Sequence, residues 1–243
     1  MAYCKSRTIA IEKNGLLAVF PMRCKSWTCS ECAPQRRKKL IAEAIEGQPT
    51  RFVTLTCNPH WFESPAERGK KLAEAWRQFV RAYRKQYPTR QLEYLAVLEL
   101  TKQGEPHLHI VVRGPYISQQ RISQHMREKM GAPVVDIRLI RNKRQVSEYV
   151  SKYISKRPIR LGTLKRYWRS LGWFTLDQRL ARQTRRGYTR VWMLDFDFKD
   201  FINSWGHQRR GYVLEVSDDF YRSIFHPWET GPPGPMDYWK RVR

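Results

Sequence analysis

Short segments rich in apolar and β-branched residues, several of them alternating with polar residues, predict β-strands along the chain. The predicted strands are 6–12, 16–21, 51–57, 91–100, 106–113, 134–140, 191–197 and 211–216. Elsewhere apolar residues recur every three or four positions, which is the pattern of amphipathic helices. The predicted helices are 33–47, 64–87, 118–131, 143–156 and 175–186. Strands and helices are mixed without an internal repeat, so we expect an α+β fold.

The first two predicted strands are joined by Asn14-Gly15, a dipeptide that strongly favours a two-residue β-hairpin turn. If these residues form the turn, strand pairing carries the chain back until Cys4 lies opposite Lys25. Cys4 is then expected close to Cys24, although the two residues are well separated in the sequence. The hairpin is therefore expected to bring cysteines from its two open ends together.

Three cysteines follow this hairpin at spacings that suit a metal site, namely Cys24, Cys29 and Cys32. The two residues between Cys29 and Cys32 let both sulfurs face one ion, and Cys4 can supply the fourth thiolate of a tetrahedral site. We therefore expect a structural zinc ion in an N-terminal Cys-rich module. Cys57 is the reserve candidate for the fourth ligand. The alternative is a group of small buried residues without a metal.

A second hairpin is predicted around the three-residue loop 102–104, with Gly104 in the left-handed conformation. Pairing about this loop puts Glu99 directly opposite His107, and His109 falls on the same face two residues further on. Two imidazoles and one carboxylate form a three-ligand site with open positions, which suits Mg²⁺ or Mn²⁺ although imidazole also binds later transition metals. The alternative is a pair of ordinary strand histidines.

The helix predicted at 143–156 carries two neighbouring stripes. The apolar stripe, expected to pack on the sheet, consists of Val146, Val150 and Ile154. The second stripe consists of Tyr149, Lys152, Tyr153 and Lys156. A tyrosine beside a divalent metal can attack a phosphodiester and leave a 5′-phosphotyrosine and a free 3′-hydroxyl, and a nearby lysine would favour the phenolate. Without the histidines, two half-buried helix aromatics would be the default interpretation.

A large excess of basic residues favours nucleic acid as the ligand. The 243 residues include 46 Lys and Arg against 22 Asp and Glu, a net charge of +24, together with 9 Trp and 12 Tyr. Cations neutralise phosphates and aromatic rings stack on bases, so we expect binding to single-stranded DNA. The candidate contacts are Arg36, Arg37, Lys165, Arg166, Tyr167, Trp168 and Arg169. A solvated basic surface is the alternative for each of them taken alone.

Three motifs in order along the chain resemble those of the HUH endonuclease superfamily. They are Phe52-Val-Thr-Leu-Thr56, His107-Leu-His109 and Tyr149-Val-Ser-Lys-Tyr-Ile-Ser-Lys156. The doubled tyrosine-lysine motif is most similar to that of two-tyrosine replication initiators from small single-stranded DNA phages and bacterial rolling-circle plasmids. The resemblance covers residues 50–157.

This resemblance implies a central antiparallel five-stranded sheet flanked by helices, with Mg²⁺ or Mn²⁺ at the active site. It also implies nicking and rejoining of single-stranded DNA at a replication origin, which provides a 3′-hydroxyl primer for rolling-circle replication. The implied metal ligands are His107 and His109, with Glu99 fitting the variable third ligand. The implied nucleophile candidates are Tyr149 and Tyr153, and the supporting lysines are Lys152 and Lys156.

Three domains are expected: 1–50 with the zinc site, 51–157 as the HUH core, and 158–243 as a basic aromatic extension. The chain lacks a GxxxxGK[ST] phosphate loop, so we expect a separate helicase and the host DNA polymerase as partners. No segment reaches the about 18 consecutive apolar residues of a membrane span, and the N-terminus has no apolar signal core. A cytoplasmic location without a membrane partner is therefore expected, in a bacterial host if a phage or plasmid encodes the chain.

Two alternatives to a replication initiator stay open. Within the same chemistry, the nearest are an HUH tyrosine transposase and a relaxase. From a different class, the chain could be a zinc-containing DNA-binding regulator without catalysis. The paired tyrosines discriminate here, because a protein that only binds DNA needs no nucleophile aligned with a metal site.

Overall fold

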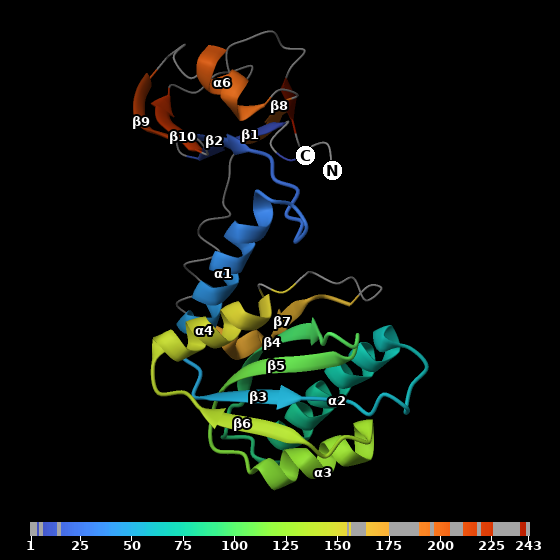
Figure 1. The fold of residues 1–243 in the computed structure, drawn as a ribbon. Helices are drawn as coiled ribbons and strands as arrows, with labels where there is room; N and C mark the ends of the chain where they lie inside the picture. The colour runs from blue at the N-terminus through green and yellow to red at the C-terminus, as the bar shows by residue number, and fades with distance from the viewer. Residues whose placement is uncertain are drawn as a thin grey trace. The chain divides into compact units, whose positions relative to one another are not determined.

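The computed structural model describes residues 4, 7–13, 16–154, 156, 164–174, 190–194, 197–204, 211–217, 220–225 and 239–241. The chain divides into two compact units (Figure 1). The larger unit comprises Gln35–Thr175, and the smaller unit combines Met1–Pro34 with Leu176–Arg243. Within the described ranges, no helix has the length and apolar character needed to cross a membrane.

A five-stranded antiparallel sheet forms the centre of the larger unit. Its order is β6-β3-β5-β4-β7, and Figure 1 shows β6, β3, β5 and β4 following one another across the unit. The strands are β3 (Arg51–Leu55), β4 (Glu93–Leu100), β5 (Pro106–Arg113), β6 (Val135–Leu139) and β7 (Tyr167–Arg169). The mixed α+β class and the five-stranded antiparallel sheet are confirmed. The strand β7 was not predicted, because its residues were interpreted only as part of a basic patch.

The helices predicted before residue 157 are present in the described part of the chain. They are α1 (Cys32–Glu46), α2 (Pro65–Gln86), α3 (Gln119–Met130) and α4 (Lys143–Ile154). Ser64 caps α2 by accepting a hydrogen bond from the backbone N–H of Glu67, and Pro65 fits the first turn. Gly131 ends α3 in the left-handed conformation, with φ of 61°. Local capping therefore explains where these two helices begin or end.

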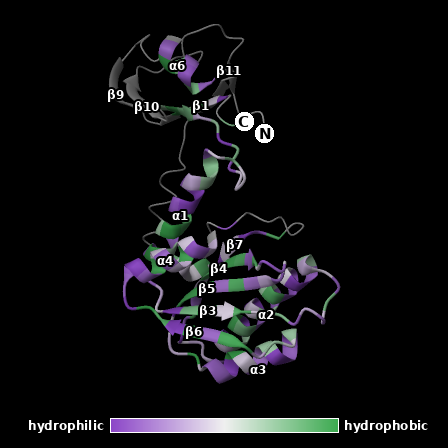
Figure 2. Ribbon diagram, viewed as in Figure 1, coloured by the Kyte–Doolittle hydropathy of each residue, from purple (hydrophilic) through white to green (hydrophobic). Residues whose placement is uncertain are grey.

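The hydrophobic core of the larger unit lies between one face of the sheet and the helices α2 and α3. Leu108, Ile110 and Val112 of β5 belong to the same buried cluster as Trp76 and Phe79 of α2. Full burial of a side chain of this size contributes about 1.5–3 kcal/mol. The predicted hairpin register puts these three β5 residues on the face opposite to the two histidines, and the structure confirms it. In Figure 2, hydrophilic and hydrophobic residues alternate along α1 and α3, as expected of amphipathic helices.

The smaller unit contains a six-stranded antiparallel sheet in the order β11-β8-β1-β2-β10-β9. Its strands are β1 (Thr8–Lys13), β2 (Leu16–Pro21), β8 (Arg190–Leu194), β9 (Gly211–Ser217), β10 (Phe220–Phe225) and β11 (Trp239–Arg241). Thr8 pairs with Pro21 and Lys13 with Leu16, which confirms the register predicted for the N-terminal hairpin. The helix α6 (Phe198–Ser204) packs near β2 and buries Phe198 and Phe201.

Strand pairing joins the N-terminal hairpin to strands after residue 189, since β1 pairs with β8 and β2 with β10. The strands predicted at 191–197 and 211–216 correspond to β8 and β9, whereas β10, β11 and α6 were not predicted. The turn residues of the N-terminal hairpin and the helix predicted at 175–186 lie outside the described residues. The domain boundaries expected after residues 50 and 157 stay a prediction that limited proteolysis would test.

Candidate active site

The hairpin of β4 and β5 forms around the predicted three-residue loop. The backbone N–H of Thr101 donates to the carbonyl of Glu105 over 2.8 Å. Gly104 has a φ of 84°, a conformation that residues with a side chain rarely adopt. Glu99 consequently lies directly opposite His107 in the strand register. This pairing aims Glu99, His107 and His109 at the face of the sheet that α2 and α3 leave uncovered.

A row of residues crosses neighbouring strands on the same face. His109 in β5 lies opposite Thr54 in β3, and Thr54 lies opposite Asp136 in β6. Directly opposite residues of an antiparallel pair point to the same face of the sheet. Thr54 and Asp136 therefore share a face with the candidate metal ligands. Asp136 forms an exposed ion pair with Arg138 over 2.9 Å.

Helix α4 covers this face with the two stripes that the sequence predicts. Val146 and Val150 are buried on the packing side. The ring of Tyr149 stacks on Phe52 of β3 with a centroid distance of 4.0 Å. The ring of Tyr153 stacks on His109 with a centroid distance of 3.4 Å and an interplanar angle of 14°. Both tyrosines therefore lie against the face that carries the histidines.

The carboxylate of Glu99 is buried between two cationic or polar partners. Its Oε2 lies 3.0 Å from His109 Nε2, and its Oε1 accepts from the ammonium of Lys156. Burial by itself would raise the pKa of Glu99, but the hydrogen bonds from His109 and Lys156 outweigh it and hold the pKa below its usual value. Glu99 is therefore an anion at neutral pH, as a metal-binding carboxylate must be.

Burial lowers the pKa of both His107 and His109, with Glu99 opposing the shift in each case. Neutral imidazole is the form that ligates metals, so burial favours the form that binds a cation. Nitrogen and carboxylate donors together fit a divalent ion such as Mn²⁺. Among the described residues, only a group of cysteines has donor atoms all within 4.8 Å of one another. The half-buried ring of His107 must therefore turn toward Glu99 and His109 for the three to share one ion.

The two tyrosine hydroxyls have different surroundings. The Tyr149 hydroxyl lies 2.9 Å from Thr54 Oγ1 and 3.4 Å from His109 Nδ1, and burial raises its pKa. Burial and the nearby Glu99 also raise the pKa of Tyr153, while the charge of Lys156 opposes them. The ammonium groups of Lys152 and Lys156 lie 5.5 Å and 5.7 Å from the centroid of the Tyr153 ring. The predicted tyrosine-lysine stripe thus sets two ammonium groups beside the Tyr153 ring.

Three arginines predicted to contact DNA, Arg36, Arg37 and Arg166, lie near the C-terminal end of α4. Arg166 Nη2 donates to the carbonyl of Lys156 over 2.6 Å and to that of Tyr153 over 3.4 Å. Burial, followed by the nearby charges of Arg37 and Arg36, lowers the pKa of Arg166 to about 10. A positive region therefore begins directly beside the candidate nucleophiles.

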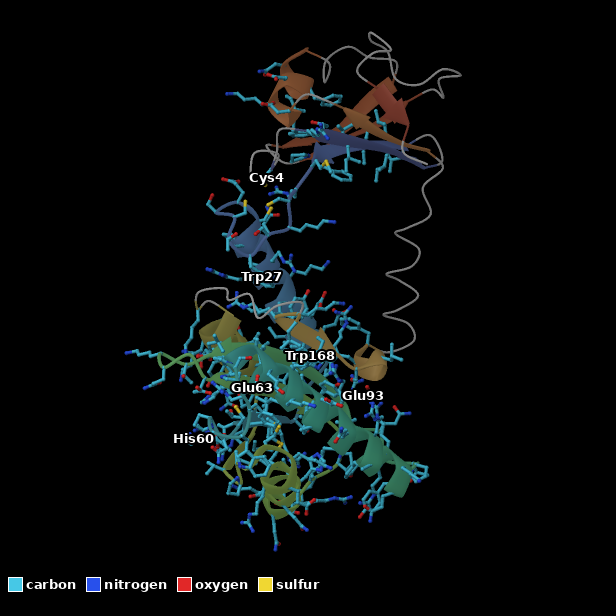
Figure 3. All side chains as sticks on the ribbon, turned by 90° about the vertical axis from the view of Figure 1, so that its right-hand side faces the viewer. Cys4, Trp27, His60, Glu63, Glu93 and Trp168 are labelled. Atoms are coloured by element: carbon cyan, nitrogen blue, oxygen red, sulfur yellow. The ribbon has the colours of Figure 1, made fainter. Side chains whose placement is uncertain are left out.

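Other residues of the predicted patch have structural contacts. Arg169 forms an ion pair with the buried Glu43 of α1 over 3.1 Å. Trp168, labelled in Figure 3, packs against the core, whereas Lys165 is exposed. The patch is therefore divided between residues that hold α1 to the sheet and residues that face solvent.

The cysteine cluster of the smaller unit can hold a metal ion. The ligand atoms of Cys4, Cys24, Cys29 and Cys32 all lie within 4.8 Å of one another, and Figure 3 shows sulfur atoms near Cys4 beside the start of α1. Cys4 precedes β1 and Cys24 follows β2, so the hairpin register does bring them together as predicted. The reserve candidate Cys57 belongs to the core of the larger unit instead.

Residues 50–158 match the model of a known family, described as a replication-associated protein. The match supports a role in DNA replication. It begins just before β3 and ends just after Lys156, so it includes both tyrosines and the candidate active-site ligands Glu99, His107 and His109. It covers less than half of the 243 residues. No curated protein and no solved structure matches the chain.

Within the matched residues 50–158, three residues near the tyrosines were not predicted as part of the site. Thr54 was predicted only as part of a strand, although its hydroxyl contacts Tyr149 and lies 3.3 Å from His109 Nδ1. Asp136 and Arg138 were strand residues without a role, yet their charges affect the pKa of Tyr149 and Tyr153. A signal for all three would have been the order of the strands, which local patterns do not contain.

Proposed function

We propose that the larger unit nicks and rejoins single-stranded DNA at a replication origin and so initiates rolling-circle replication. The observation that supports this best is the stacking of Tyr153 on His109 beside Glu99. It combines a hydroxyl nucleophile, an imidazole and a buried carboxylate on one face of the sheet. The family match over residues 50–158 agrees with replication as the process.

In this proposal Glu99, His107 and His109 hold Mg²⁺ or Mn²⁺. The bound ion would polarise the scissile phosphate and stabilise the charge that develops on the leaving 3′-oxygen. Burial keeps the two imidazoles neutral and the hydrogen bonds keep the carboxylate ionised, so the donor set is ready for a cation at neutral pH. Lys156 must yield its contact with Glu99 when the ion binds.

The tyrosine oxygen attacks phosphorus, a P–O bond to tyrosine forms, and the P–O3′ bond breaks. The tyrosine gives up one proton and the leaving 3′-oxygen takes up one, so the reaction leaves the number of protons unchanged. One phosphate ester replaces another, and the reverse reaction can join strands without ATP. The charges of Lys152 and Lys156 favour the phenolate that attacks.

The basic residues around α4 are proposed to guide the strand. Arg36, Arg37 and Lys165 would neutralise backbone phosphates, as expected for a chain with a net charge of +24. Arg166 would act both on DNA and on the end of α4, since it already holds two carbonyls there. Tyr167 and Trp168 are proposed to support base stacking, although Trp168 is partly packed against the core.

The four-cysteine cluster is proposed to bind a structural zinc ion. Thiolate is the ligand that zinc prefers in closed tetrahedral sites, and four sulfurs within one coordination sphere meet that requirement. Such an ion would tie the open end of the β1–β2 hairpin to the start of α1, since Cys4 and Cys24 flank the hairpin and Cys32 begins the helix.

A separate helicase and the host DNA polymerase complete the proposed reaction, in the cytoplasm of a bacterial host. An HUH transposase or relaxase would use the same chemistry on other DNA, and the replication-associated match favours the initiator. A non-catalytic zinc-containing DNA-binding regulator remains the alternative from another class. It would leave the stacking of Tyr153 on His109 without a role.

The proposal is tested with labelled single-stranded origin DNA and Mn²⁺, followed by denaturing gel electrophoresis. The wild-type protein should form a covalent adduct that resists denaturation, and the double variant Tyr149→Phe/Tyr153→Phe should form none. Tyr116→Phe is the matched control, because Tyr116 is 66% exposed and its ring faces Arg51 rather than the histidines. Absence of an adduct from folded wild-type protein on every candidate origin strand would reject the catalytic function.

A further inference from the structure

We infer that the two tyrosines have different roles in the first strand cleavage. Tyr153 is the nucleophile, and Tyr149 is a positioning residue that acts with Thr54 to hold the His109 ring with Nε2 toward Glu99. This inference rests on the proposed function, which treats both tyrosines as equivalent candidates. It is carried by the contacts on the two sides of a single imidazole.

The two nitrogens of His109 face different partners. On one side, Nε2 lies 3.0 Å from Glu99 Oε2. On the other side, Nδ1 lies 3.3 Å from Thr54 Oγ1 and 3.4 Å from the Tyr149 hydroxyl. The hydroxyl of Tyr149 therefore lies on the Nδ1 side of the ring, away from the carboxylate. A divalent ion held by Glu99 and His109 would lie on the opposite, Nε2 side.

Proton accounting assigns the tautomer of this ring. A neutral imidazole has one N–H. In the metal-free structure this proton lies on Nε2, which faces the ionised Glu99, but a bound metal ion needs the Nε2 lone pair, so in the metal-bound protein the proton must reside on Nδ1. This N–H can donate to Thr54 Oγ1 or to the Tyr149 oxygen. The Tyr149 hydroxyl can in turn donate to Thr54 Oγ1 or to the carbonyl of Val53 at 3.5 Å. The network is complete with Tyr149 neutral, which is a fixed and unreactive state.

Packing reinforces this state of Tyr149. Its ring is stacked on Phe52 at 4.0 Å and meets the edge of Tyr153 at 4.8 Å. An attack by Tyr149 would require its hydroxyl to leave Thr54 and to pass to the other side of the His109 ring. Such a movement would also remove the groups that hold His109 in the required tautomer.

Tyr153, unlike Tyr149, is placed as a nucleophile requires, near the proposed metal ligands and outside the hydrogen-bond network of His109 Nδ1. It stacks on the face of His109, so its hydroxyl is not tied to the Nδ1 side. Glu99 and Lys156 are the charged groups that act on it most strongly, which locates it near the proposed metal ligands. Lys152 and Lys156 both approach its ring, whereas Tyr149 has Thr54 and aromatic rings around it.

The first test compares covalent adducts of single variants on the same labelled strand. Tyr153→Phe is expected to lose the adduct, while Tyr149→Phe retains it when Mn²⁺ is saturating. An adduct that persists in Tyr153→Phe, or one that is lost in Tyr149→Phe at saturating Mn²⁺, overturns the assignment. If the wild-type protein forms no adduct, the proposed function fails, and the metal measurements below still test the positioning role.

The second test measures Mn²⁺ affinity of the full chain by electron paramagnetic resonance. Tyr149→Phe and Thr54→Val should weaken Mn²⁺ binding about 10- to 100-fold, as is typical when a partner of a metal-bound histidine is removed. Thr54→Ser keeps the hydroxyl and should restore wild-type affinity, and Tyr153→Phe should leave affinity unchanged. Because Tyr149→Phe keeps the ring, a loss of affinity reports the hydroxyl and not the packing. Unchanged affinity in both Tyr149→Phe and Thr54→Val overturns the positioning role.

The tautomer itself gives a third readout that does not depend on activity. Long-range ¹H–¹⁵N correlation spectra should show His109 protonated on Nε2 in the metal-free protein, where Nε2 faces the Glu99 carboxylate, and on Nδ1 at saturating Mg²⁺. In Thr54→Val/Tyr149→Phe the change to the Nδ1 form should require more Mg²⁺, because the Nδ1–H has lost both of its acceptors. A wild-type His109 that stays protonated on Nε2 at saturating Mg²⁺ contradicts the inference.

Discussion

Lys156 donates a hydrogen bond to Oε1 of Glu99, the same carboxylate whose Oε2 lies 3.0 Å from His109 Nε2. The single buried carboxylate of Glu99 therefore interacts with an ammonium group and an imidazole at the same time. A divalent ion that binds to Glu99 and His109 has to compete with the ammonium. Lys156 can leave easily, because 48% of its side chain is exposed.

Replacing Lys156 by Met should therefore strengthen metal binding while it weakens strand cleavage. The pair joins a half-exposed ammonium to a buried carboxylate, and removing a competing contact of about 1 kcal/mol should let Mn²⁺ bind about two- to fivefold more tightly. The cleavage rate should fall at the same time, since Tyr153 loses a nearby cation. Calorimetric titration with Mn²⁺ provides the measurement. Lys152→Met removes a charge from α4 but leaves the Lys156 ammonium in place. Equal gains in Mn²⁺ affinity in both variants would show that Lys156 does not compete with the ion for Glu99.

Glycines 104 and 47 should respond differently to the same substitution. Gly104→Ala adds a methyl group where no atom lies within 4 Å, so only its φ of 84° opposes the change. We expect a loss of about 1 kcal/mol in the free energy of unfolding. Gly47→Ala would set its methyl group 2.1 Å from the Trp173 ring and should destabilise more. Denaturant titration of both variants measures the difference in the free energy of unfolding. If Gly104→Ala lost as much stability as Gly47→Ala, backbone strain at Gly104 would not be the sole cause of its loss.

Alkaline pH should destabilise the larger unit through Cys57. Burial raises the pKa of this thiol from 9.0 to about 11, with Glu105 adding to the shift. An acid whose folded-state pKa is raised contributes stability below its unfolded pKa, and that stability is lost as pH rises from 9.0 toward 11. A shift of this size corresponds to at most about 2–3 kcal/mol.

The measurement compares denaturant unfolding at pH 8 and pH 10.5 in wild type and in Cys57→Ala. Both proteins contain the same lysines, the same tyrosines and the same four other cysteines, so the difference between their two pH responses isolates the Cys57 thiol. The variant should lose less stability on going to high pH, even though its smaller side chain lowers stability at both pH values. Equal losses would show that Cys57 does not titrate in this range.

Zinc removal should affect the smaller unit first. Elemental analysis is expected to find one zinc ion per chain, and Cys29→Ser or Cys32→Ser should lose it. Hydrogen exchange of β1 and β2 should then accelerate, while the core of α2 and α3 in the larger unit stays protected. Cys57→Ala is the matched cysteine control and should keep the ion. A zinc content that does not depend on Cys29 and Cys32 would remove this site from the proposal.

Local chemistry made much of the candidate site predictable. The length of loop 102–104 and its glycine determine the hairpin register, and a slip by one residue would turn every side chain to the other face. Glu99 opposite His107 could therefore be predicted without any knowledge of the sheet. The same reasoning at the N-terminal hairpin brought Cys4 to Cys24.

Relationships between distant strands could not be predicted in this way. Nothing in the sequence near Thr54 indicates that β3 lies between β5 and β6, and the contacts of Thr54 with Tyr149 and His109 depend on that order. The partnership of β1 with β8 has the same cause, since sheet neighbours that are far apart in the chain leave no periodic pattern. Periodicity predicts which face of a strand is buried but not which strand lies beside it.

The central position of the N-terminal hairpin in its sheet has a consequence for synthesis on the ribosome. β1 and β2 emerge early, but their outer neighbours β8 and β10 begin only at Arg190 and Phe220. At about 5–20 residues per second, the hairpin waits on the order of ten to forty seconds with both of its hydrogen-bonding edges open. During this interval the larger unit can complete its own sheet, whereas the hairpin is exposed to pairing with other nascent chains. A tetrahedral ion at its base would hold the two strands in register until their partners arrive.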